Sequence, residues 1–117
     1  MMNENSDSLV FVLQHKNDRF DPMPFSIARS WTEDLGADIA LYVMYDALEL
    51  IKKDAVEGAP DIRESLDALL AAGVSIYACG FCSRACELST DDYYPGIQVA
   101  NRQIFHGLMS DRRPLYW

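Results

Sequence analysis

The feature that most constrains this chain is a regular alternation of short apolar runs with segments of helical periodicity. Runs such as "LVFVL" and "IALYVM" are apolar at every position, and each is followed by a segment whose apolar residues recur at helical spacing. Strands that are apolar on both faces and separated by helices are typical of a parallel sheet with helices on each side, joined by right-handed crossovers. The alternation therefore predicts an α/β fold: a small Rossmann-like, doubly wound domain with a mostly parallel sheet of about five strands and helices on both faces.

Turn and cap residues set the boundaries of the expected elements. The expected strands cover residues 8–15, 37–45, 74–79, 96–100 and 113–117, and the expected helices cover residues 22–35, 46–54, 60–72, 80–88 and 101–110. For the first helix, Asp21 is expected as the N-cap and Gly36 as the residue past the end. At 117 residues the chain can bury one core, so residues 1–117 are expected to form a single domain, with residues 1–7 flexible.

Composition excludes several classes of protein. No apolar run approaches the roughly 20 residues of a spanning helix, and the N-terminus "MMNENSDSLV" lacks the positive region and apolar stretch of a secretory signal. We therefore expect a soluble, cytoplasmic protein without a membrane span. The net charge of −8 argues against nucleic acid as a partner, because phosphate neutralisation needs clustered Lys and Arg.

All three cysteines lie in one stretch, "YACGFCSRACELS". Cys79 is expected to end the third strand and Cys82 to lie in the first turn of the next helix, where unpaired backbone N–H groups favour an anion. A thiolate stabilised there would be nucleophilic at neutral pH. Gly80, which lacks a Cβ, would let the backbone turn tightly and a reacting group approach. Cys86 lies one turn further along the helix and is expected to be a packing residue.

The other candidate residues come from the edge of the sheet. In an open parallel α/β sheet, ligands bind outside the carboxyl ends of the strands, near the point where the strand order reverses. Residues that directly follow the expected strands are therefore candidates for a cleft beside Cys79 and Cys82; they are His15, Asn17, Tyr45, Asp46, Gly80, Phe81 and Asn101.

Alternative roles for these residues stay open. A zinc or iron–sulfur site would need further ligands, and the C-x₂-C-x₃-C order has no partner cysteine and no histidine at ligand spacing. Cys79 and Cys82 have the C-x-x-C spacing of dithiol oxidoreductases. Any of the three thiols could also be packing. His15 and His106 are candidate acid–base partners, with His15 favoured by its place at the edge. No phosphate-binding glycine motif occurs, so dinucleotide-binding and P-loop functions have no motif to support them.

The stretch "GVSIYACGFCSRACEL", in which a strand ends in a cysteine at the head of a helix, resembles the DsrE/TusD-like (DsrE/DsrF-like) family of sulfur-relay proteins. The segments "ADIALYVMYDALELIKK" and "PGIQVANRQIFHGLMSDRRPLYW" are similar to the family in pattern as well. The resemblance implies a Rossmann-like subunit that assembles into homo-oligomers, trimers or hexamers, and acts in sulfur trafficking without a cofactor.

In that family the cysteine that ends the third strand carries sulfur as a persulfide and exchanges it with small carrier proteins of the TusA type. The matching position here is Cys79. Many relatives have a single cysteine in this loop, whereas this sequence adds Cys82 and Cys86. It is therefore open whether Cys79 alone carries the sulfur or whether Cys82 resolves it as a disulfide.

Three hypotheses follow for the function. The leading one is a sulfur-relay protein, a sulfurtransferase or persulfide carrier, that acts through Cys79. The second is a dithiol/disulfide oxidoreductase that uses Cys79 and Cys82. The third is a non-catalytic subunit that keeps the fold and binds a small ligand or partner in the cleft at the strand ends.

Overall fold

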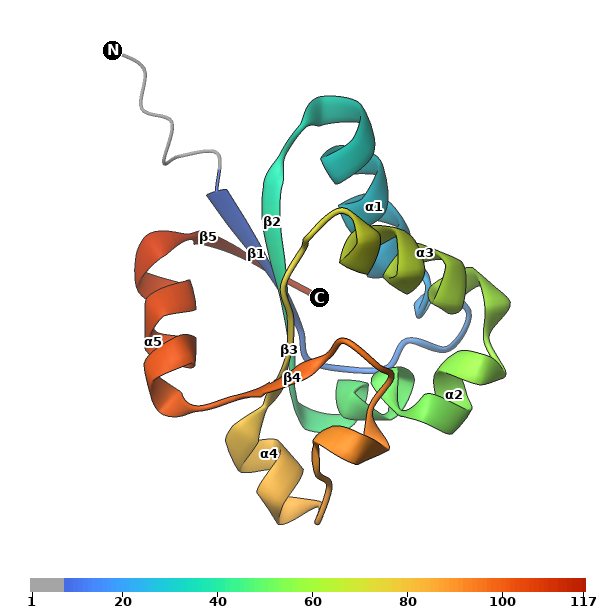
Figure 1. The fold of residues 1–117 in the computed structure, drawn as a ribbon, viewed down its shortest axis with the longest axis vertical. Helices are drawn as coiled ribbons and strands as arrows, with labels where there is room; N and C mark the ends of the chain where they lie inside the picture. The colour runs from blue at the N-terminus through green and yellow to red at the C-terminus, as the bar shows by residue number, and fades with distance from the viewer. Residues whose placement is uncertain (1–7) are drawn as a thin grey trace.

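The fold is taken from a computed structural model, which describes residues 8–117. The expectation that residues 1–7 are flexible lies outside the described residues. The sheet has five strands in the order β4-β3-β2-β1-β5, and every neighbouring pair is parallel (Figure 1). The strands are β1 (Ser8–Leu13), β2 (Asp38–Val43), β3 (Ile76–Cys79), β4 (Gln98–Ala100) and β5 (Arg113–Tyr116). This confirms the predicted fold class.

Helices cover both faces of the sheet. The α-helices are α1 (Met23–Leu35), α2 (Lys53–Glu57), α3 (Pro60–Ala71), α4 (Gly80–Ala85) and α5 (Arg102–Asp111). Figure 1 shows α1 and α3 side by side on one face and α5 on the other, with α4 beyond the end of β3. Three short 3₁₀ helices lie in the connections: η2 (Asp18–Phe20), η3 (Tyr45–Ile51) and η4 (Thr90–Asp92).

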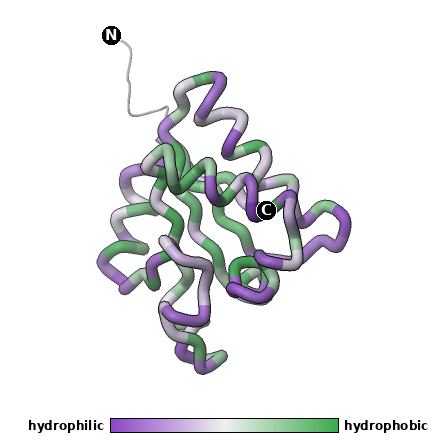
Figure 2. The backbone as a smooth tube through the Cα atoms, turned by 45° about the vertical axis from the view of Figure 1, so that its right-hand side comes forward, coloured by the Kyte–Doolittle hydropathy of each residue, from purple (hydrophilic) through white to green (hydrophobic). Residues whose placement is uncertain are grey.

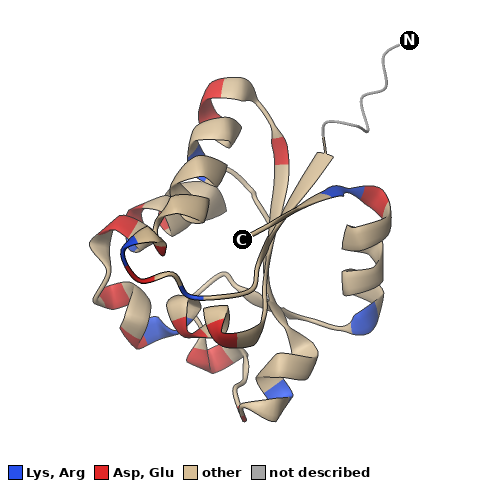
Figure 3. Ribbon diagram, turned by 180° about the vertical axis from the view of Figure 1, so that it is seen from behind, with Lys and Arg blue, Asp and Glu red and all other residues tan. Residues whose placement is uncertain are grey.

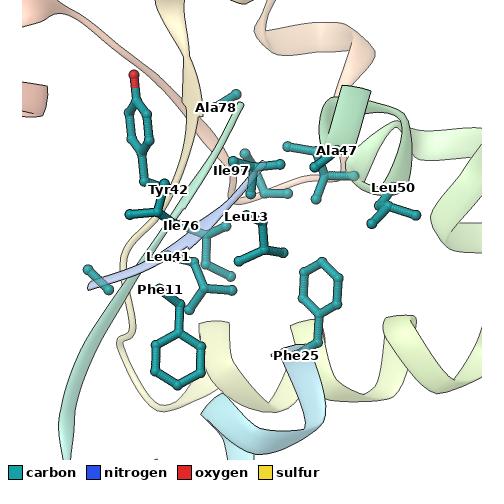
Figure 4. Packing of buried hydrophobic residues seen from close by; sticks show 14 of the residues in the cluster. Phe11, Leu13, Phe25, Leu41, Tyr42, Ala47, Leu50, Ile76, Ala78 and Ile97 are labelled. Atoms are coloured by element: carbon teal, nitrogen blue, oxygen red, sulfur yellow. The ribbon is translucent and has the colours of Figure 1, made fainter. Parts of the chain in front are cut away.

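The core lies between the sheet and these helices. The central strands are the most hydrophobic part of the tube in Figure 2, and every residue from Leu9 to Leu13 is buried. In Figure 4 the side chains of Phe11 and Leu41 lie on the side of the sheet where Phe25 of α1 packs, whereas Tyr42 points to the opposite face of the sheet. Fully burying a Leu or Phe side chain contributes about 1.5–3 kcal/mol, so this two-sided burial is what stabilises a parallel sheet.

The segment after β2 differs from the single helix expected over residues 46–54. Residues 45–51 form η3, Lys52 is extended, and α2 begins only at Lys53. The buried side chains of η3 are Ala47, Leu48, Leu50 and Ile51. Because a 3₁₀ helix has three residues per turn, it places positions 47 and 50, and 48 and 51, in two rows that both face the core. Tertiary packing therefore overrides the α-helical periodicity here.

The expected N-cap of the first helix is also wrong. The helix begins at Met23, and its N-cap position is Pro22, which has no capping side chain. Asp21 instead accepts a hydrogen bond from the backbone N–H of Asn17 and so closes the loop before the helix. Gly36 lies past the helix end in the left-handed region, with φ of 65°, as expected.

Candidate functional site

The site is built at the junction of β3 and α4. Cys79 is both the last residue of β3 and the N-cap of α4, and its Sγ accepts a hydrogen bond of 3.3 Å from the backbone N–H of Cys82. The hydroxyl of Ser83 donates to the Cys79 carbonyl at 2.7 Å and lies 2.6 Å from the hydroxyl of buried Tyr93. These contacts hold the start of α4 against the end of the strand, so the thiol has a defined position.

Tyr42 is the second group that acts on the Cys79 thiol. Tyr42 pairs with Tyr77 across β2 and β3, and alternation places Tyr42, Tyr77 and Cys79 on the same face of the sheet. The Tyr42 side chain lowers the pKa of the Cys79 thiol, and its ring packs on Phe105 of α5 with a centroid distance of 4.7 Å. Burial raises the pKa of Tyr42, which keeps the hydroxyl protonated as a donor.

The pKa values of the two buried thiols are shifted in opposite directions. Burial raises the pKa of Cys79, but the Tyr42 side chain and the hydrogen bond from the Cys82 N–H outweigh it, so the pKa of Cys79 lies below its usual value. Burial and the neighbouring Cys79 raise the pKa of Cys82, although its Sγ accepts a 3.4 Å hydrogen bond from the Tyr45 N–H. The arrangement therefore favours one thiolate, on Cys79, beside a protonated Cys82.

Cys86 does not pack in the core, which corrects the expectation from the sequence. The thiol of Cys86 is exposed, whereas those of Cys79 and Cys82 are buried. The sequence predicts a helix over residues 80–88 with Cys86 one turn after Cys82, whereas α4 ends at Ala85 and Cys86 is its C-cap. The Cys86 side chain is therefore exposed to solvent and does not pack in the core.

Cys79 and Cys82 open onto a cleft of about 690 Å³ at the carboxyl edge of the sheet. The cleft is lined by Tyr42, Met44, Tyr45, Cys79, Gly80, Phe81, Cys82, Arg84, Ala100, Asn101, Arg102, Gln103 and Phe105. Although Cys79 is only 6% exposed, it faces this opening, and Tyr45 and Phe81 at the rim are 51% and 74% exposed. A reactant can therefore reach the thiol through the cleft.

The cleft has a different charge from most of the molecule. Figure 3 shows acidic residues gathered on the side of α1, α2 and α3, whereas the only charged residues of α4 and of the first turn of α5 are basic. These are Arg84 and Arg102, and both line the cleft. Within residues 8–117, no ion pair with a carboxylate involves either arginine. Two such cations favour an anionic reactant in a protein whose net charge is −8.

The structure brings together some of the predicted residues and separates others. Tyr45, Gly80, Phe81 and Asn101 line the cleft with Cys79 and Cys82. Asn101 is the N-cap of α5, and its side chain accepts a 2.8 Å hydrogen bond from the Ile104 N–H. The side-chain amide oxygen of Asn101 therefore caps α5, the helix that carries Arg102.

His15, Asn17 and Asp46 lie outside this cleft. His15 Nδ1 is 2.9 Å from the Asp46 carboxylate, and this hydrogen bond lowers the pKa of Asp46. The imidazole also stacks on the ring of Tyr45 at 5.9 Å, so the pair supports the rim of the cleft from outside. Asn17 and His15 instead line a separate pocket near the ends of β1 and β5.

Three residues near Cys79 were not predicted from the sequence: Tyr42, Ser83 and Arg84. Tyr42 is hidden in an apolar run, and its relation to Cys79 depends on the β2–β3 register, which the sequence alone does not specify. Ser83 and Arg84 stand in the cysteine stretch itself. Their positions could have been predicted, because a helix that directly follows a strand begins at the same edge of the sheet as the strand's last residue.

Removing the Tyr42 hydroxyl should change the pH dependence of Cys79. In Tyr42→Phe the burial of the thiol is no longer offset by this donor, so the pKa of Cys79 should rise. Iodoacetamide should then alkylate Cys79 more slowly than in the wild type near pH 7, and the two rates should converge above both pKa values. Peptide-resolved mass spectrometry measures these rates, and Tyr77→Phe, on the same face but outside the cleft, is the matched control. An unchanged profile in Tyr42→Phe would contradict the role of this hydroxyl.

Two further observations bear on the kind of protein. In the part of the chain that the structure describes, no three His, Cys, Asp or Glu side chains gather as a ligand set for a metal ion. No helix within residues 8–117 has the length and apolar character needed to cross a membrane.

The fold and the site together define a doubly wound α/β protein with a cysteine at the carboxyl end of its third strand. The DsrE/DsrF-like family matches residues 9–113, and the chain belongs to this family. The resemblance stated from the sequence is thereby confirmed.

The solved structures that are similar to this chain share its fold. The uncharacterized protein MK0008 of Methanopyrus kandleri is 30% identical over 66 residues, and the match covers 56% of this chain and about half, 54%, of that protein. Among solved structures, the protein of unknown function MTH1491 from Methanobacterium thermoautotrophicum has a TM-score of 0.71 at 20% identity, with 94% of this chain and 98% of that chain covered. The ychN protein from E. coli has a TM-score of 0.71 at 15% identity, with 95% and 99% covered. The conserved protein of unknown function BT1422 from Bacteroides thetaiotaomicron has a TM-score of 0.73 at 15% identity, with both chains covered fully.

Proposed function

We propose that this protein is a sulfur-relay protein that accepts and donates sulfane sulfur as a persulfide on Cys79. The observation that carries the proposal is the position of Cys79, whose thiol accepts a hydrogen bond from the Cys82 N–H and has its pKa lowered by the Tyr42 side chain at the base of an open cleft. Membership of the DsrE/DsrF-like family supports it. A lowered pKa is the property that a nucleophilic thiol needs at neutral pH.

The reaction needs only thiol chemistry. The Cys79 thiolate attacks the outer sulfur of a donor persulfide R–S–SH. The S–S bond of the donor breaks, a Cys79–S–SH persulfide forms, and the donor leaves as the thiolate R–S⁻. In the second half, an acceptor thiolate attacks the outer sulfur of Cys79–S–SH and regenerates the Cys79 thiolate. No electron leaves or enters the protein in either step, so no cofactor is required.

The groups around Cys79 suit such an intermediate. The N–H of Cys82 donates to the sulfur, the Tyr42 side chain lowers its pKa, and Arg84 and Arg102 add positive charge in the cleft. A persulfide anion is stabilised by the same donors as a thiolate. The exposed rings of Tyr45 and Phe81 at the rim offer apolar area to a carrier protein. A carrier of the TusA type, a trimeric or hexameric assembly and a cytoplasmic location belong to the same proposal.

The proposal is tested by loading the reduced protein with a low-molecular-weight persulfide donor. Intact-mass measurement should show a gain of about 32 Da per carried sulfur. The gain should vanish after treatment with dithiothreitol, because a second thiol removes the outer sulfur. A wild-type protein that gains no sulfur under these conditions would contradict the proposal.

The dithiol reaction remains the second candidate, because one observation favours it. The Cys82 N–H donates to Cys79 Sγ, and the two buried thiols open onto the same cleft. After mild oxidation, peptide mapping should then find a reversible disulfide between Cys79 and Cys82, and its loss on reduction gives a potential. If mapping finds only Cys86 in mixed disulfides, the oxidoreductase hypothesis fails.

A further inference from the structure

Two arginines from different elements line the cleft that leads to Cys79. Arg84 lies four residues after Gly80 in α4, so the two positions share one face of the helix. Arg84 Nη1 is 3.6 Å from the place that an ideal Cβ of residue 80 would occupy. The guanidinium of Arg84 therefore lies back over Gly80, the residue next to the reactive thiol.

Arg102 reaches the cleft from the neighbouring strand. Cys79 pairs with Ala100 across β3 and β4, and Arg102 follows Ala100 by two residues as the first residue of α5. Both arginines are exposed, whereas Cys79 is only 6% exposed. A reactant on its way to the buried thiol therefore passes the two guanidinium groups, which lie closer to solvent.

The formal charge of the cleft lining is positive only. None of the lining residues is Asp or Glu, and within residues 8–117 neither Arg84 nor Arg102 forms an ion pair. Exposed charges are screened over about 8 Å at physiological salt, so a reactant inside the cleft interacts mainly with the charges of the lining. The cleft can therefore attract an anion although the whole chain has a net charge of −8.

The size of the cleft suits a small molecule. Its volume of about 690 Å³ lies inside the range of roughly 300–1,000 Å³ that is typical of small-molecule sites. A carboxylate is the organic anion that matches the planar fork of a guanidinium. A free cysteine derivative keeps its carboxylate close to its sulfur, whereas a cysteine inside a protein chain has this group in a peptide bond. The arginines therefore provide a means to distinguish the two.

We propose that the sulfur donor of this protein is a small persulfide of the cysteine type, whose free carboxylate is bound by Arg84 and Arg102 while its outer sulfur meets Cys79. This inference rests on the sulfur-relay function proposed above and specifies its donor. The Cys79 thiolate attacks the outer sulfur, the S–S bond of the donor breaks, and the thiolate R–S⁻ leaves with its carboxylate, so atoms and electrons balance between the two reactants. The arginines select the donor and take no part in the breaking of the bond.

The first test compares the alkylation of Cys79 by iodoacetate, an anion, and by iodoacetamide, its neutral analogue. Both reagents react with the same thiolate, so a change in the pKa of Cys79 cancels in the ratio of the two rates. The double variant Arg84→Gln/Arg102→Gln should lower the ratio of the iodoacetate rate to the iodoacetamide rate by about 2- to 10-fold, as expected for the loss of two exposed ion pairs. Peptide-resolved mass spectrometry measures both rates.

Arg63→Gln is the matched control for this change of charge. Arg63 is an exposed residue of α3 and lies outside the cleft, so its replacement should leave the ratio unchanged. In about 1 M sodium chloride, where the screening length falls to about 3 Å, the ratio of the wild type should approach that of the double variant.

The second test compares two sulfur donors, the persulfide of N-acetylcysteine and the persulfide of N-acetylcysteine amide. The amide lacks the carboxylate and so resembles a cysteine inside a chain. Intact-mass measurement follows the gain of about 32 Da with each donor. The ratio of the loading rate with the carboxylate donor to that with the amide donor should be about 2- to 10-fold lower in the double variant than in the wild type, and unchanged in Arg63→Gln.

The outcomes separate this inference from the proposed function. If both donors load Cys79 but the ratio of their rates is the same in the wild type and the double variant, the donor assignment is wrong and the sulfur-relay proposal stands. If neither donor loads the wild type, the sulfur-relay proposal fails and the donor assignment fails with it. An alkylation ratio that the double variant does not change would show that the cleft does not select anions, and would overturn the donor assignment in either case.

Discussion

Replacing Cys79 with serine should abolish sulfur loading of the protein by a persulfide donor. The Cys79 thiolate is the nucleophile of the proposed reaction, and a serine hydroxyl in its place is essentially un-ionised at neutral pH. We expect the adduct of about 32 Da to form at least about 100-fold more slowly than in the wild type. Intact-mass spectrometry over a time course measures this rate.

The remaining cysteines serve as matched controls for this result. Cys86→Ser should load as the wild type does, because Cys86 is exposed and outside the cleft. Cys82→Ser should also load, since Cys79 keeps the Cys82 backbone N–H as a donor. An undiminished adduct on Cys79→Ser, or loss of loading only in Cys82→Ser, would contradict the assignment of Cys79 as the carrier.

The Cys82→Ser variant also separates the two thiol hypotheses. If Cys82 resolves the persulfide, its thiolate attacks the inner sulfur of Cys79–S–SH, forms a disulfide between Cys79 and Cys82 and releases HS⁻. Wild-type protein loaded with sulfur would then release sulfide without added thiol, and Cys82→Ser would retain its adduct. If Cys79 alone carries the sulfur, the adduct should have the same lifetime in both proteins. The raised pKa of Cys82 favours the second outcome.

Replacing Gly80 with alanine should destabilise the fold at the site itself. An ideal Cβ at position 80 would overlap the carbonyl oxygen of Ala100, and both backbones are held by the pairing of Cys79 with Ala100 across β3 and β4. Because neither side can move freely, the free energy of unfolding should fall by about 2–3 kcal/mol. For a domain of this size the melting temperature should fall by roughly 10 °C. Thermal unfolding followed by circular dichroism measures this change.

Gly107 provides the matched control for the same substitution. It lies inside α5, and no atom lies within 4 Å of an ideal Cβ at this position. Gly107→Ala should therefore raise the free energy of unfolding by about 0.5–1 kcal/mol, the usual gain for alanine over glycine inside a helix. A Gly80→Ala protein as stable as the wild type would show that the approach of α4 to the end of β4 is not a constraint.

Much of the local structure could be predicted from the sequence. Strands β1 and β2 are apolar on both faces, and helices α1, α3 and α5 have apolar residues at helical spacing, so the class of fold follows from residue types alone. The strand–cysteine–helix junction could be predicted as well, because Cys79 directly follows an apolar run and Gly80 begins a new helical pattern. Where prediction failed, as in η3, the buried residues follow the shape of the core rather than an α-helical period.

The aromatic end of the chain shows the limit of such reasoning. The closing "RRPLYW" suggests that Tyr116 and Trp117 are both buried in the sheet or at an interface. In the structure Tyr116 is 61% exposed, whereas Trp117 packs on Phe11. Successive residues of a strand point to opposite faces, so only one of the two can face α1.

The sequence by itself determined that this protein is a parallel α/β domain with a cysteine at the end of its third strand. Local periodicity and cap residues carry that information, because they act within a few residues of each other. Only the tertiary structure decided which groups act on that cysteine. Tyr42, Arg102 and Phe105 are remote from Cys79 in sequence and reach the cleft through the register of β2 and the placement of α5. The tertiary structure also decided that Cys86, at the C-cap of α4, is exposed.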